Sequence, residues 1–341
     1  MSTTSTPAVW LPTIRTGTGS DTFTLRLCNG LNSRGIRTEI TWFPLHSEYF
    51  PMLTAIAQPP AWANVSHINS WLPQRFWPKA LPVVATVHHL VHDAAYDPFR
   101  SRSQAAYHRL VILPRERRAI LRADAVTTVS NYVKKTLKSF SERADVSVIE
   151  NWIEEETFCL PELAPSAHNQ PFILFMAGCH SRRKGADLLP TFAKSLGSDF
   201  QIRCTGSPPN CRSLPNLYPL GRVTDQQLVG EFQRCDAVVS LSRYEGFGYT
   251  ALEAAVCGKP FLGFNTSALT EVAMAGAGTL VPVDDVASLA NAARNLRSQS
   301  PPTLEQMKCR REQILQRFNK HSLDAYIDIY ARVISKYNFS Q

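Results

Sequence analysis

The sequence predicts an α/β protein of two doubly wound, Rossmann-like domains, and three observations lead to this fold. First, 341 residues provide enough chain for two domains of ordinary size. Second, short apolar runs typical of buried strands alternate with helix-like runs, which indicates parallel sheets. Third, proline, acidic and polar residues cluster at 152–170, where one domain can end and the next begin. Because ligands of open α/β sheets bind beyond the carboxyl ends of strands, we expect a ligand cleft between the two domains.

The N-terminal half contains four strand-like runs and three helix-like runs. Strands are expected at 8–15, 36–43, 81–87 and 124–130, and helices at 22–35, at 103–123 and from Asn131 onward. The run 16–21, TGTGSD, predicts a turn, and Gly35 ends the first helix. Residues 60–80 are rich in tryptophan and follow no regular pattern.

The C-terminal half repeats the same alternation. Strands are expected at 171–178, 199–206, 236–242, 259–264 and 278–283, and helices near 185–196, 249–258 and 284–296. A last amphipathic helix at 321–337 has an apolar stripe, which predicts that it packs on a core. We therefore expect domains at 1–155 and 156–320, with residues 321–341 forming a C-terminal helix that returns to the N-terminal domain.

Composition excludes several classes of protein. Hydrophobic residues make up 44% and charged residues 19%, which is typical of a globular protein rather than a disordered one. The longest apolar runs, such as 81–87, are too short to span a bilayer. The first twelve residues lack the basic and apolar regions of a signal peptide. Eight cysteines without a metal-binding spacing indicate reduced thiols, so a cytoplasmic location is expected.

Positive charge is concentrated in the N-terminal half. Residues 1–150 hold 17 Lys and Arg against 10 Asp and Glu, which accounts for +7 of the chain's net +8. This excess predicts an anionic partner, namely a lipid headgroup, a diphosphate or a nucleic acid. The segment 109–122, RLVILPRERRAILR, is either a solvated helix face or a surface that rests on anionic membrane at the inner face of the plasma membrane. No nucleic-acid recognition motif accompanies the charge, so nucleic acid is not expected as a partner.

The stretch 242–263, SRYEGFGYTALEAAVCGKPFLG, carries the strongest chemical pattern. Glu245 and Glu253 stand eight positions apart, and Gly246 and Gly248 let the backbone approach a ligand closely. The helix expected from Tyr249 offers free N–H groups and a partial positive charge at its start, which favour a diphosphate. Two acids that bind hydroxyl groups therefore flank one anion site.

This stretch resembles the E-x7-E signature of glycosyltransferase family 4, the retaining, nucleotide-sugar-dependent transferases of the GT-B fold. Other segments resemble the family's motifs in the same order: 17–19 (GTG), 86–89 (TVHH), 123–130 (ADAVTTVS), 148–151 (VIEN), 178–185 (GCHSRRKG) and 220–223 (LGRV). One departure concerns Cys179, which stands where the family usually has arginine. Lys184 is intact, and the expectation is that either Arg182 or Arg183 supplies the missing guanidinium or that the enzyme relies more heavily on Lys184.

The resemblance implies a role for each matching residue. Lys184 with Arg183 would stabilise the leaving diphosphate, Glu245 would orient the sugar, His88 would contact it, and Glu253 would hold the ribose. The donor-binding residues implied by the motifs are Gly17, Gly19, Gly178, Arg182, Val223, Gly246, Phe247, Gly248, Tyr249, Thr250 and Glu253. The chain contains no D-x-D motif, so no metal site and no cofactor are expected; the nucleotide sugar is a substrate.

The function implied is retaining transfer of a hexose from a nucleotide sugar to a saccharide or lipid-linked saccharide, in polysaccharide, lipopolysaccharide or glycolipid synthesis. Mannose from GDP-mannose is the preferred donor, and UDP-sugars are the alternative. Two other functions stay open. A non-catalytic GT-B-like binding subunit would have lost its activity with the arginine replaced by Cys179. A nucleotide-sugar 2-epimerase shares the architecture but does not explain Lys184 and the two glutamates together.

Overall fold

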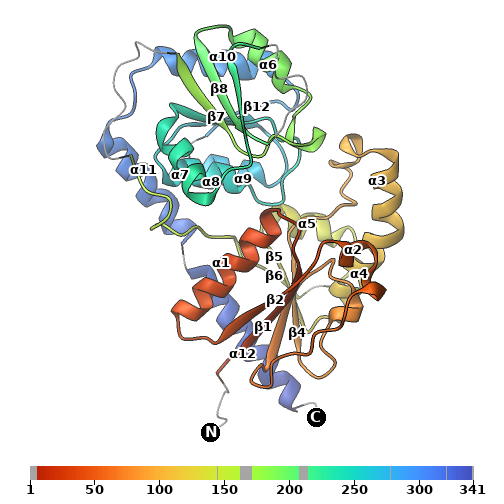
Figure 1. Ribbon diagram of the computed structural model, residues 1–341. Coiled ribbons are helices and arrows are strands. Elements are labelled where there is room, and N and C mark those ends of the chain that lie inside the picture. Colours follow the sequence, from red (N-terminus) through yellow and green to blue (C-terminus); the bar gives the residue numbers. More distant parts are fainter. Residues whose placement is uncertain are drawn as a thin grey trace. The chain divides into compact units, whose positions relative to one another are not determined.

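The computed structural model describes residues 6–143, 145–161, 171–206, 214–276, 278–319 and 321–339 (Figure 1). The chain forms two compact units. Unit 1 comprises Met1–Asp93, Ser101–Trp152 and Lys320–Gln341, and unit 2 comprises Ala94–Arg100 and Ile153–Asn319. Each unit holds one parallel six-stranded sheet, so the predicted two-domain α/β architecture is confirmed. The chain passes from unit 1 to unit 2 between Trp152 and Ile153, close to the expected limit at residue 155.

The sheet of unit 1 has the strand order β2-β1-β3-β4-β5-β6, and its neighbouring strands are parallel. Its strands are β1 (Val9–Ile14), β2 (Thr38–Phe43), β3 (Val65–Asn69), β4 (Val83–Val87), β5 (Ala125–Thr128) and β6 (Val146–Val148). The sequence analysis did not predict β3 or β6. β3 is buried throughout, but three of its five residues, Ser66, His67 and Asn69, are polar. It therefore lacks the continuous apolar run that predicts a buried strand.

Helices α1 (Gly19–Ser33) and α12 (His321–Phe339) share one core with this sheet. Phe23 of α1 packs edge-on against Tyr326 of α12 and against Trp152, with ring centroids 6.0 and 6.1 Å away. The apolar stripe predicted for the C-terminal helix is therefore buried within unit 1. Unit 1 also contains α2 (His46–Tyr49), α5 (Asn131–Lys138) and the 3₁₀ turns η1 (Pro51–Leu53) and η2 (Gln74–Phe76).

The helix predicted at 103–123 is divided into three parts. They are α3 (Arg102–Tyr107), the π-helical turn η4 (His108–Ile112) and α4 (Leu113–Arg122). Pro114 lies at the start of α4, directly after η4, and has no N–H group to donate to the preceding turn. A π-helical turn inside a helix shifts the side chains that follow it to a new face.

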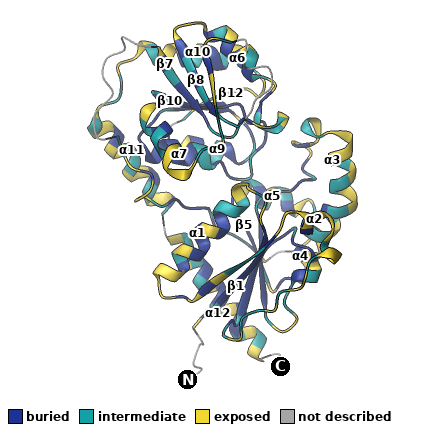
Figure 2. Cartoon of the chain, in the orientation of Figure 1, coloured by how far each residue is buried: buried dark blue, intermediate teal, exposed yellow. Residues whose placement is uncertain are grey.

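The sheet of unit 2 has the strand order β12-β11-β10-β7-β8-β9, and its neighbouring strands are also parallel. Its strands are β7 (Phe172–Met176), β8 (Phe200–Thr205), β9 (Leu217–Gly221), β10 (Ala237–Ser240), β11 (Phe261–Phe264) and β12 (Thr279–Val281). All but β9 fall in the predicted runs. The strands of each sheet carry mostly buried residues, whereas the surrounding helices alternate buried and exposed sides (Figure 2).

The helices of unit 2 surround its sheet, and α11 packs against α8. They are α6 (Leu189–Leu196), α7 (Asp225–Arg234), α8 (Tyr249–Val256), α9 (Leu269–Ala275), α10 (Val286–Ser298) and α11 (Leu304–Arg317). α6 and α10 share one hydrophobic core with the strands. None of the helices in the described part of the chain combines the length and the apolar composition that a membrane-spanning helix needs.

Residues Ala94–Arg100 belong to unit 2 although the chain on both sides of them belongs to unit 1. This segment, which includes the 3₁₀ turn η3 (Asp97–Phe99), was not anticipated from the sequence. The ring of Tyr96 stacks on that of Tyr244 with centroids 5.2 Å apart and an interplanar angle of 17°. The segment therefore packs directly against the stretch that carries Glu245.

Candidate functional site

The two most distinctive motifs of unit 2 leave the sheet at neighbouring strands. β7 and β10 pair in parallel, and the chain runs outward from them on either side, so the strand order reverses between them. The loop after β7 carries Gly178–Gly185, and the loop after β10 carries Arg243–Gly248. The point where strand order reverses is where open α/β sheets bind their ligands. The topology therefore brings the predicted residues to the expected position.

Three charged side chains meet at this point. Lys184 Nζ lies 2.5 Å from Glu245 Oε1, and Arg183 Nη1 lies 3.5 Å from Glu245 Oε2. The Glu245 side chain is 14% exposed. Burial alone would raise the pKa of Glu245, but Lys184 and Arg183 outweigh it and lower that pKa to about 2. Glu245 is therefore an anion at any physiological pH, and two cations stand beside it.

Glu253 takes part in the same electrostatic cluster. It lies on the buried face of α8 and is 7% exposed. Burial lowers the pKa of Lys184, while the carboxylates of Glu245 and Glu253 act to raise it. The two acids of the E-x7-E pattern thus act on one lysine, although they come from a loop and from a helix.

The loop that carries Lys184 has a well-defined local geometry. The Ser181 side chain accepts a hydrogen bond from the Lys184 N–H group and caps the 3₁₀ turn η5 (Arg182–Lys184). Gly185 ends the turn with φ of 72°, and a Cβ atom there would lie 2.2 Å from the carbonyl oxygen of Leu241. Only glycine fits both the conformation and the space, so Gly185 fixes the direction of the preceding lysine.

Arg243 joins the two loops and was not predicted as a site residue. Its side chain is 4% exposed and bonds to Asp187 at 2.6 Å, to Asp284 at 2.5 Å and to the carbonyl oxygen of Arg182 at 2.7 Å. Its guanidinium carbon lies 5.1 Å from the ring centroid of Phe99. Its backbone N–H group also donates to the carbonyl oxygen of Arg183. Arg243 therefore holds the Arg182–Lys184 turn in place through bonds to the carbonyl oxygens of Arg182 and Arg183.

The glycine-rich stretch after Glu245 starts α8. Gly248 has φ of 112°, and a Cβ atom there would lie 3.0 Å from Leu269 Cδ1. Gly246, Tyr249 and Thr250 are half-buried. Phe247 is 5% exposed and packs edge-on against Phe318, with centroids 5.7 Å apart. The side chain of Phe247 thus serves packing, whereas the start of α8 presents backbone N–H groups.

The loop after β7 explains the departure at Cys179. Cys179 is fully buried in the core beneath α6, so this position holds a packing residue where the resemblance expects arginine. Arg183 contacts Glu245, whereas the Arg182 side chain is 65% exposed and its Nε lies 3.8 Å from Asp187. Partial burial, Lys184 and Arg183 lower the pKa of His180, which places this histidine beside the cluster. His180 was not predicted from the sequence.

Two further predicted residues of unit 2 lie in loops. Gly178, which follows β7, has φ of 78°, and its N–H group donates to Thr205 Oγ1. Val223 is half-buried between β9 and α7, next to Thr224, which caps α7. Both follow the carboxyl ends of strands of the same sheet.

The glycine loop of unit 1 is already filled by an internal anion. The Asp21 carboxylate accepts hydrogen bonds from the N–H groups of Thr16 and Gly17, at 3.0 and 2.7 Å, and from Thr16 Oγ1 at 2.8 Å. Gly17 has φ of 71°, and Gly19 begins α1. A phosphate at the Gly17 N–H group would have to compete with Asp21, and the donor contacts expected for Gly17 and Gly19 stay a prediction.

His88 follows β4 and is held by a chain of hydrogen bonds. Asn69 Nδ2 donates to Thr13 Oγ1 at 2.9 Å, which turns Asn69 Oδ1 toward His88 Nε2 at 2.7 Å. Since Oδ1 can only accept, His88 Nε2 carries the proton and Nδ1 is left as an acceptor. Burial lowers the pKa of His88 to about 3, with smaller effects from His89 and His67. His88 is therefore a neutral imidazole of one tautomer.

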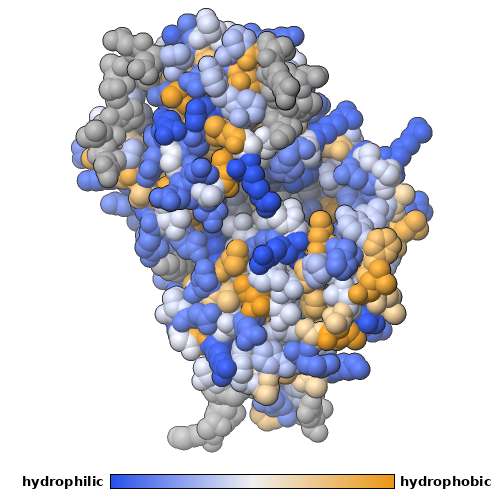
Figure 3. All heavy atoms as spheres, viewed as in Figure 1, coloured by the Kyte–Doolittle hydropathy of each residue, from blue (hydrophilic) through white to orange (hydrophobic). Residues whose placement is uncertain are grey.

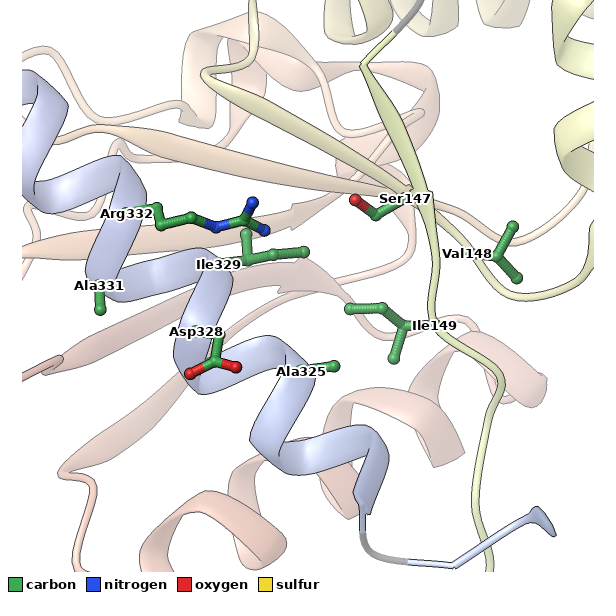
Figure 4. Close-up of a pocket in the computed structure, with 8 residues that line it drawn as sticks. All are labelled: Ser147, Val148, Ile149, Ala325, Asp328, Ile329, Ala331 and Arg332. Atoms are coloured by element: carbon green, nitrogen blue, oxygen red, sulfur yellow. The ribbon is translucent and has the colours of Figure 1, made fainter.

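A cavity of about 580 Å³ lies elsewhere in unit 1, between β6 and α12. In Figure 4 the Arg332 side chain extends from α12 toward Ser147 on β6. The cavity is lined by Ser147, Val148, Ile149, Ala325, Asp328, Ile329, Ala331 and Arg332. None of these was predicted as a site residue, so this cavity is separate from the candidate site. In the described residues, no group of three or more His, Cys, Asp or Glu side chains is placed to hold a metal ion.

Comparison with known families gives two matches that together span more than half of the chain. Residues 53–157 match the model of "Glycosyltransferase Family 4", and residues 170–299 match that of "Glycosyl transferases group 1". The chain belongs to glycosyltransferase family 4. The second match includes Gly178–Gly185 and the E-x7-E stretch, whereas Gly17 and Gly19 lie outside both matches.

Curated relatives of this family 4 chain match only part of it. N-acetyl-alpha-D-glucosaminyl L-malate synthase of Bacillus anthracis is 23% identical over 233 residues, which cover 63% of this chain and 61% of the relative. An uncharacterised glycosyltransferase of Methanocaldococcus jannaschii is 27% identical over 168 residues, or 46% of this chain and 45% of the relative. The chain thus spans about half the length of these relatives.

Solved structures match nearly the whole chain and show its fold. Sucrose-phosphate synthase of Thermosynechococcus elongatus superimposes with a TM-score of 0.75 at 18% identity, over 97% of this chain and 100% of that one. HepE of Anabaena, solved with UDP-glucose, superimposes with a TM-score of 0.68 at 16% identity, over 95% and 98% of the two chains. The family 4 chain therefore has the GT-B fold.

Proposed function

We propose that this family 4 chain transfers a hexose from a nucleotide sugar to a saccharide or lipid-linked saccharide, with retention at the anomeric carbon. The observation that carries the proposal is the Lys184–Glu245–Arg183 cluster at the strand-order reversal of unit 2, with Glu253 on the adjoining helix. Cations beside a helix start are suited to a departing diphosphate, and buried carboxylates are suited to hydroxyl groups. Family membership and the GT-B fold support the same reaction class.

The proposed transfer step accounts for every bond and proton without a further reactant. The bond between the anomeric carbon and the diphosphate oxygen breaks, and a bond from the acceptor oxygen forms on the same face. The acceptor proton passes to the departing phosphate oxygen. Lys184 has three donors, so it can keep its bond to Glu245 and still donate to the phosphate. Arg183 adds a second cation, and the first N–H groups of α8 complete the anion site.

Glu245 and Glu253 are assigned to the two ends of the donor. Glu245 lies in the loop after β10, and its backbone N–H group donates to Ser267 Oγ at 2.8 Å, which fixes the loop that presents its carboxylate. We assign it to the hydroxyls of the transferred sugar. Glu253, one turn inside α8, is assigned to the ribose. The role expected for His88 in contacting the sugar stays a prediction.

The donor, the acceptor and the metal requirement are part of the proposal. GDP-mannose is proposed first, from the sequence resemblance. UDP-glucose and UDP-N-acetylglucosamine are the alternatives, because HepE was solved with UDP-glucose and the Bacillus anthracis relative is named for an N-acetylglucosaminyl group. We propose that transfer needs no divalent metal, so EDTA should leave the rate unchanged. A saccharide acceptor on a lipid carrier would bring the protein to a membrane surface.

Calorimetric binding of the three donors to the wild-type protein and to Glu253→Ala tests the donor site. We expect one donor to bind, and Glu253→Ala to weaken it about tenfold or more, because a buried charged hydrogen-bond partner is lost. Glu312→Ala is the control, since Glu312 is an exposed glutamate on α11 of the same unit. Binding that is equal in Glu253→Ala and wild type would contradict the assignment of Glu253.

The competing functions give different products. A donor that binds but is neither transferred nor hydrolysed would favour the non-catalytic subunit. A donor converted to its 2-epimer would identify an epimerase. A product with the opposite anomeric configuration, read from its NMR coupling constant, would overturn retention.

A further inference from the structure

Large exposed hydrophobic side chains are concentrated in one short segment of unit 1. Thirteen such residues are exposed in the described part of the chain, and six of them lie between residues 45 and 56. They are Leu45, Tyr49, Phe50, Met52, Leu53 and Ile56, and Met52 and Leu53 are 73% and 77% exposed. Figure 3 shows apolar spheres gathered on the side of unit 1 that carries α2. We call residues 45–56 the apolar segment.

The apolar segment packs against residues 102–122, which comprise α3, η4 and α4. We call residues 102–122 the basic helix. Tyr107 donates to Glu48 Oε1 at 2.9 Å, and Arg115 Nη2 donates to the carbonyl oxygen of Glu48 at 2.9 Å. The rings of Tyr49 and Tyr107 lie 5.3 Å apart. The basic helix adds two exposed hydrophobic residues, Leu110 at 74% and Leu121 at 70%. Eight of the thirteen exposed residues thus lie on these two adjoining elements.

Charge on the two elements is almost entirely positive. The basic helix contains six arginines, of which Arg102, Arg109, Arg117, Arg118 and Arg122 are exposed. The two elements contain only two acids, Glu48 and Glu116. Glu48 is engaged by Tyr107, and Glu116 is 2% exposed. Burial raises the pKa of Glu116 to about 8, so it carries little charge at neutral pH.

We propose that the apolar segment and the basic helix form a docking surface for an anionic lipid bilayer. Protruding aliphatic and aromatic side chains beside arginines match the boundary between acyl chains and anionic headgroups. A second copy of this chain would place like charges against each other, which disfavours self-association through this surface. The inference deepens the proposed function, since a lipid-linked acceptor requires the protein at a membrane.

Vesicle flotation tests the surface directly, with phosphatidylcholine vesicles and with vesicles that contain phosphatidylglycerol. We expect the wild-type protein to float with the anionic vesicles, and high salt to weaken this binding. Phe50→Ser/Leu53→Ser should weaken it about tenfold or more, because two side chains no longer enter the acyl region. Arg117→Gln/Arg118→Gln should weaken it on the order of tenfold at low salt. Leu25→Ser, at a residue of unit 1 that is 45% exposed, should bind like wild type.

Other outcomes would overturn the docking surface. Wild-type protein that stays with neither vesicle, or a Phe50→Ser/Leu53→Ser variant that floats like wild type, contradicts it. A wild-type dimer in sedimentation equilibrium that the same variant converts to monomer would make the surface an interface between copies. Donor calorimetry on the variants separates the two proposals, because unit 2 keeps its donor residues in all of them. A variant that loses vesicle binding but still binds the donor shows that its substitutions affect the docking surface alone. A wild-type protein that binds vesicles but none of the donors would support the docking surface and refute the proposed function.

Discussion

At the scale of single residues, Lys184 and Glu245 depend on each other. The Glu245 carboxylate is mostly buried, and its low pKa exists only because Lys184 and Arg183 compensate the cost of burial. Removing one partner of a buried ion pair is costly since the other charge stays behind without compensation. The pair is therefore a structural element of the loop as well as the proposed diphosphate contact.

We predict that Lys184→Met lowers the free energy of unfolding by about 2 kcal/mol at pH 7. Glu245 has a folded-state pKa of about 2 against an ordinary value of 4.5, so its stabilisation is present above pH 4.5 and is lost as pH falls toward 2. The difference between variant and wild type should therefore shrink between pH 5 and pH 3. Urea unfolding at pH 7 and pH 3.5 measures this change.

Two further variants control this prediction. Lys194→Met changes an exposed lysine on α6 and should leave stability within about 0.5 kcal/mol of wild type. Lys184→Met/Glu245→Gln removes the uncompensated charge and should be more stable than Lys184→Met alone. A pH-independent loss in Lys184→Met would show that packing, and not the pair, accounts for the effect.

At the scale of elements, the Arg182–Lys184 turn owes its position to Arg243. Two carboxylates, two backbone carbonyl oxygens and the Phe99 ring converge on this one residue. Phe99 comes from the segment Ala94–Arg100, which the chain inserts into unit 2. Three stretches that are distant in sequence thus fix the turn that presents the cations.

We predict that Arg243→Lys weakens donor binding about tenfold, although Arg243 is not proposed to touch the donor. A lysine cannot reproduce the forked contacts to Asp187 and Asp284, so the turn loosens. Hydrogen exchange at the N–H groups of Lys184 and Gly185, which bond to Ser181 and Arg182, should become faster. Arg234→Lys is the control, because Arg234 is 59% exposed and its partner Glu231 keeps its two bonds to Arg203. Unchanged exchange together with weakened binding would point to a direct donor contact instead.

The sequence predicted the elements that follow simple periodicity, and missed those that depend on distant partners. Nine of the twelve strands in the described part of the chain lie in runs that were predicted from their apolar residues, and β3, β6 and β9 do not. β3 was missed because its buried polar groups are satisfied by other elements, as when His67 bonds to Tyr330 and Thr86. Lys184, Arg183 and Glu245 were predicted and are brought together. Arg243 was missed because its partners Asp187 and Asp284 lie 56 and 41 positions away in the sequence. No local sequence pattern predicts that an arginine is buried. Asn69 was missed for the same reason.

At the scale of the whole molecule, each unit has a hydrophobic core of its own. The C-terminal helix α12 contributes Leu323 and Tyr326 to the core of unit 1, although it follows all of unit 2 in the chain. Leu323 is fully buried, and a Cβ atom at Gly30 of α1 would lie 2.7 Å from it. Met307 of α11 is fully buried in unit 2, where it lies against Gly258. These two residues probe the two cores separately.

We predict two thermal transitions in calorimetry, one for each unit. Leu323→Ala should lower only the transition temperature of unit 1, and Met307→Ala only that of unit 2. Each substitution should reduce the free energy of unfolding of its own unit by about 2–5 kcal/mol. The donor that binds should raise the transition that Met307→Ala lowers, because Lys184, Arg183 and Glu253 all belong to unit 2 and binding to the folded state stabilises it. A single transition that both variants and the donor shift alike would mean that the two cores unfold as one cooperative block. A donor that raises only the transition sensitive to Leu323→Ala would move the principal donor contacts to unit 1 and overturn the assignment of Lys184 and Glu253.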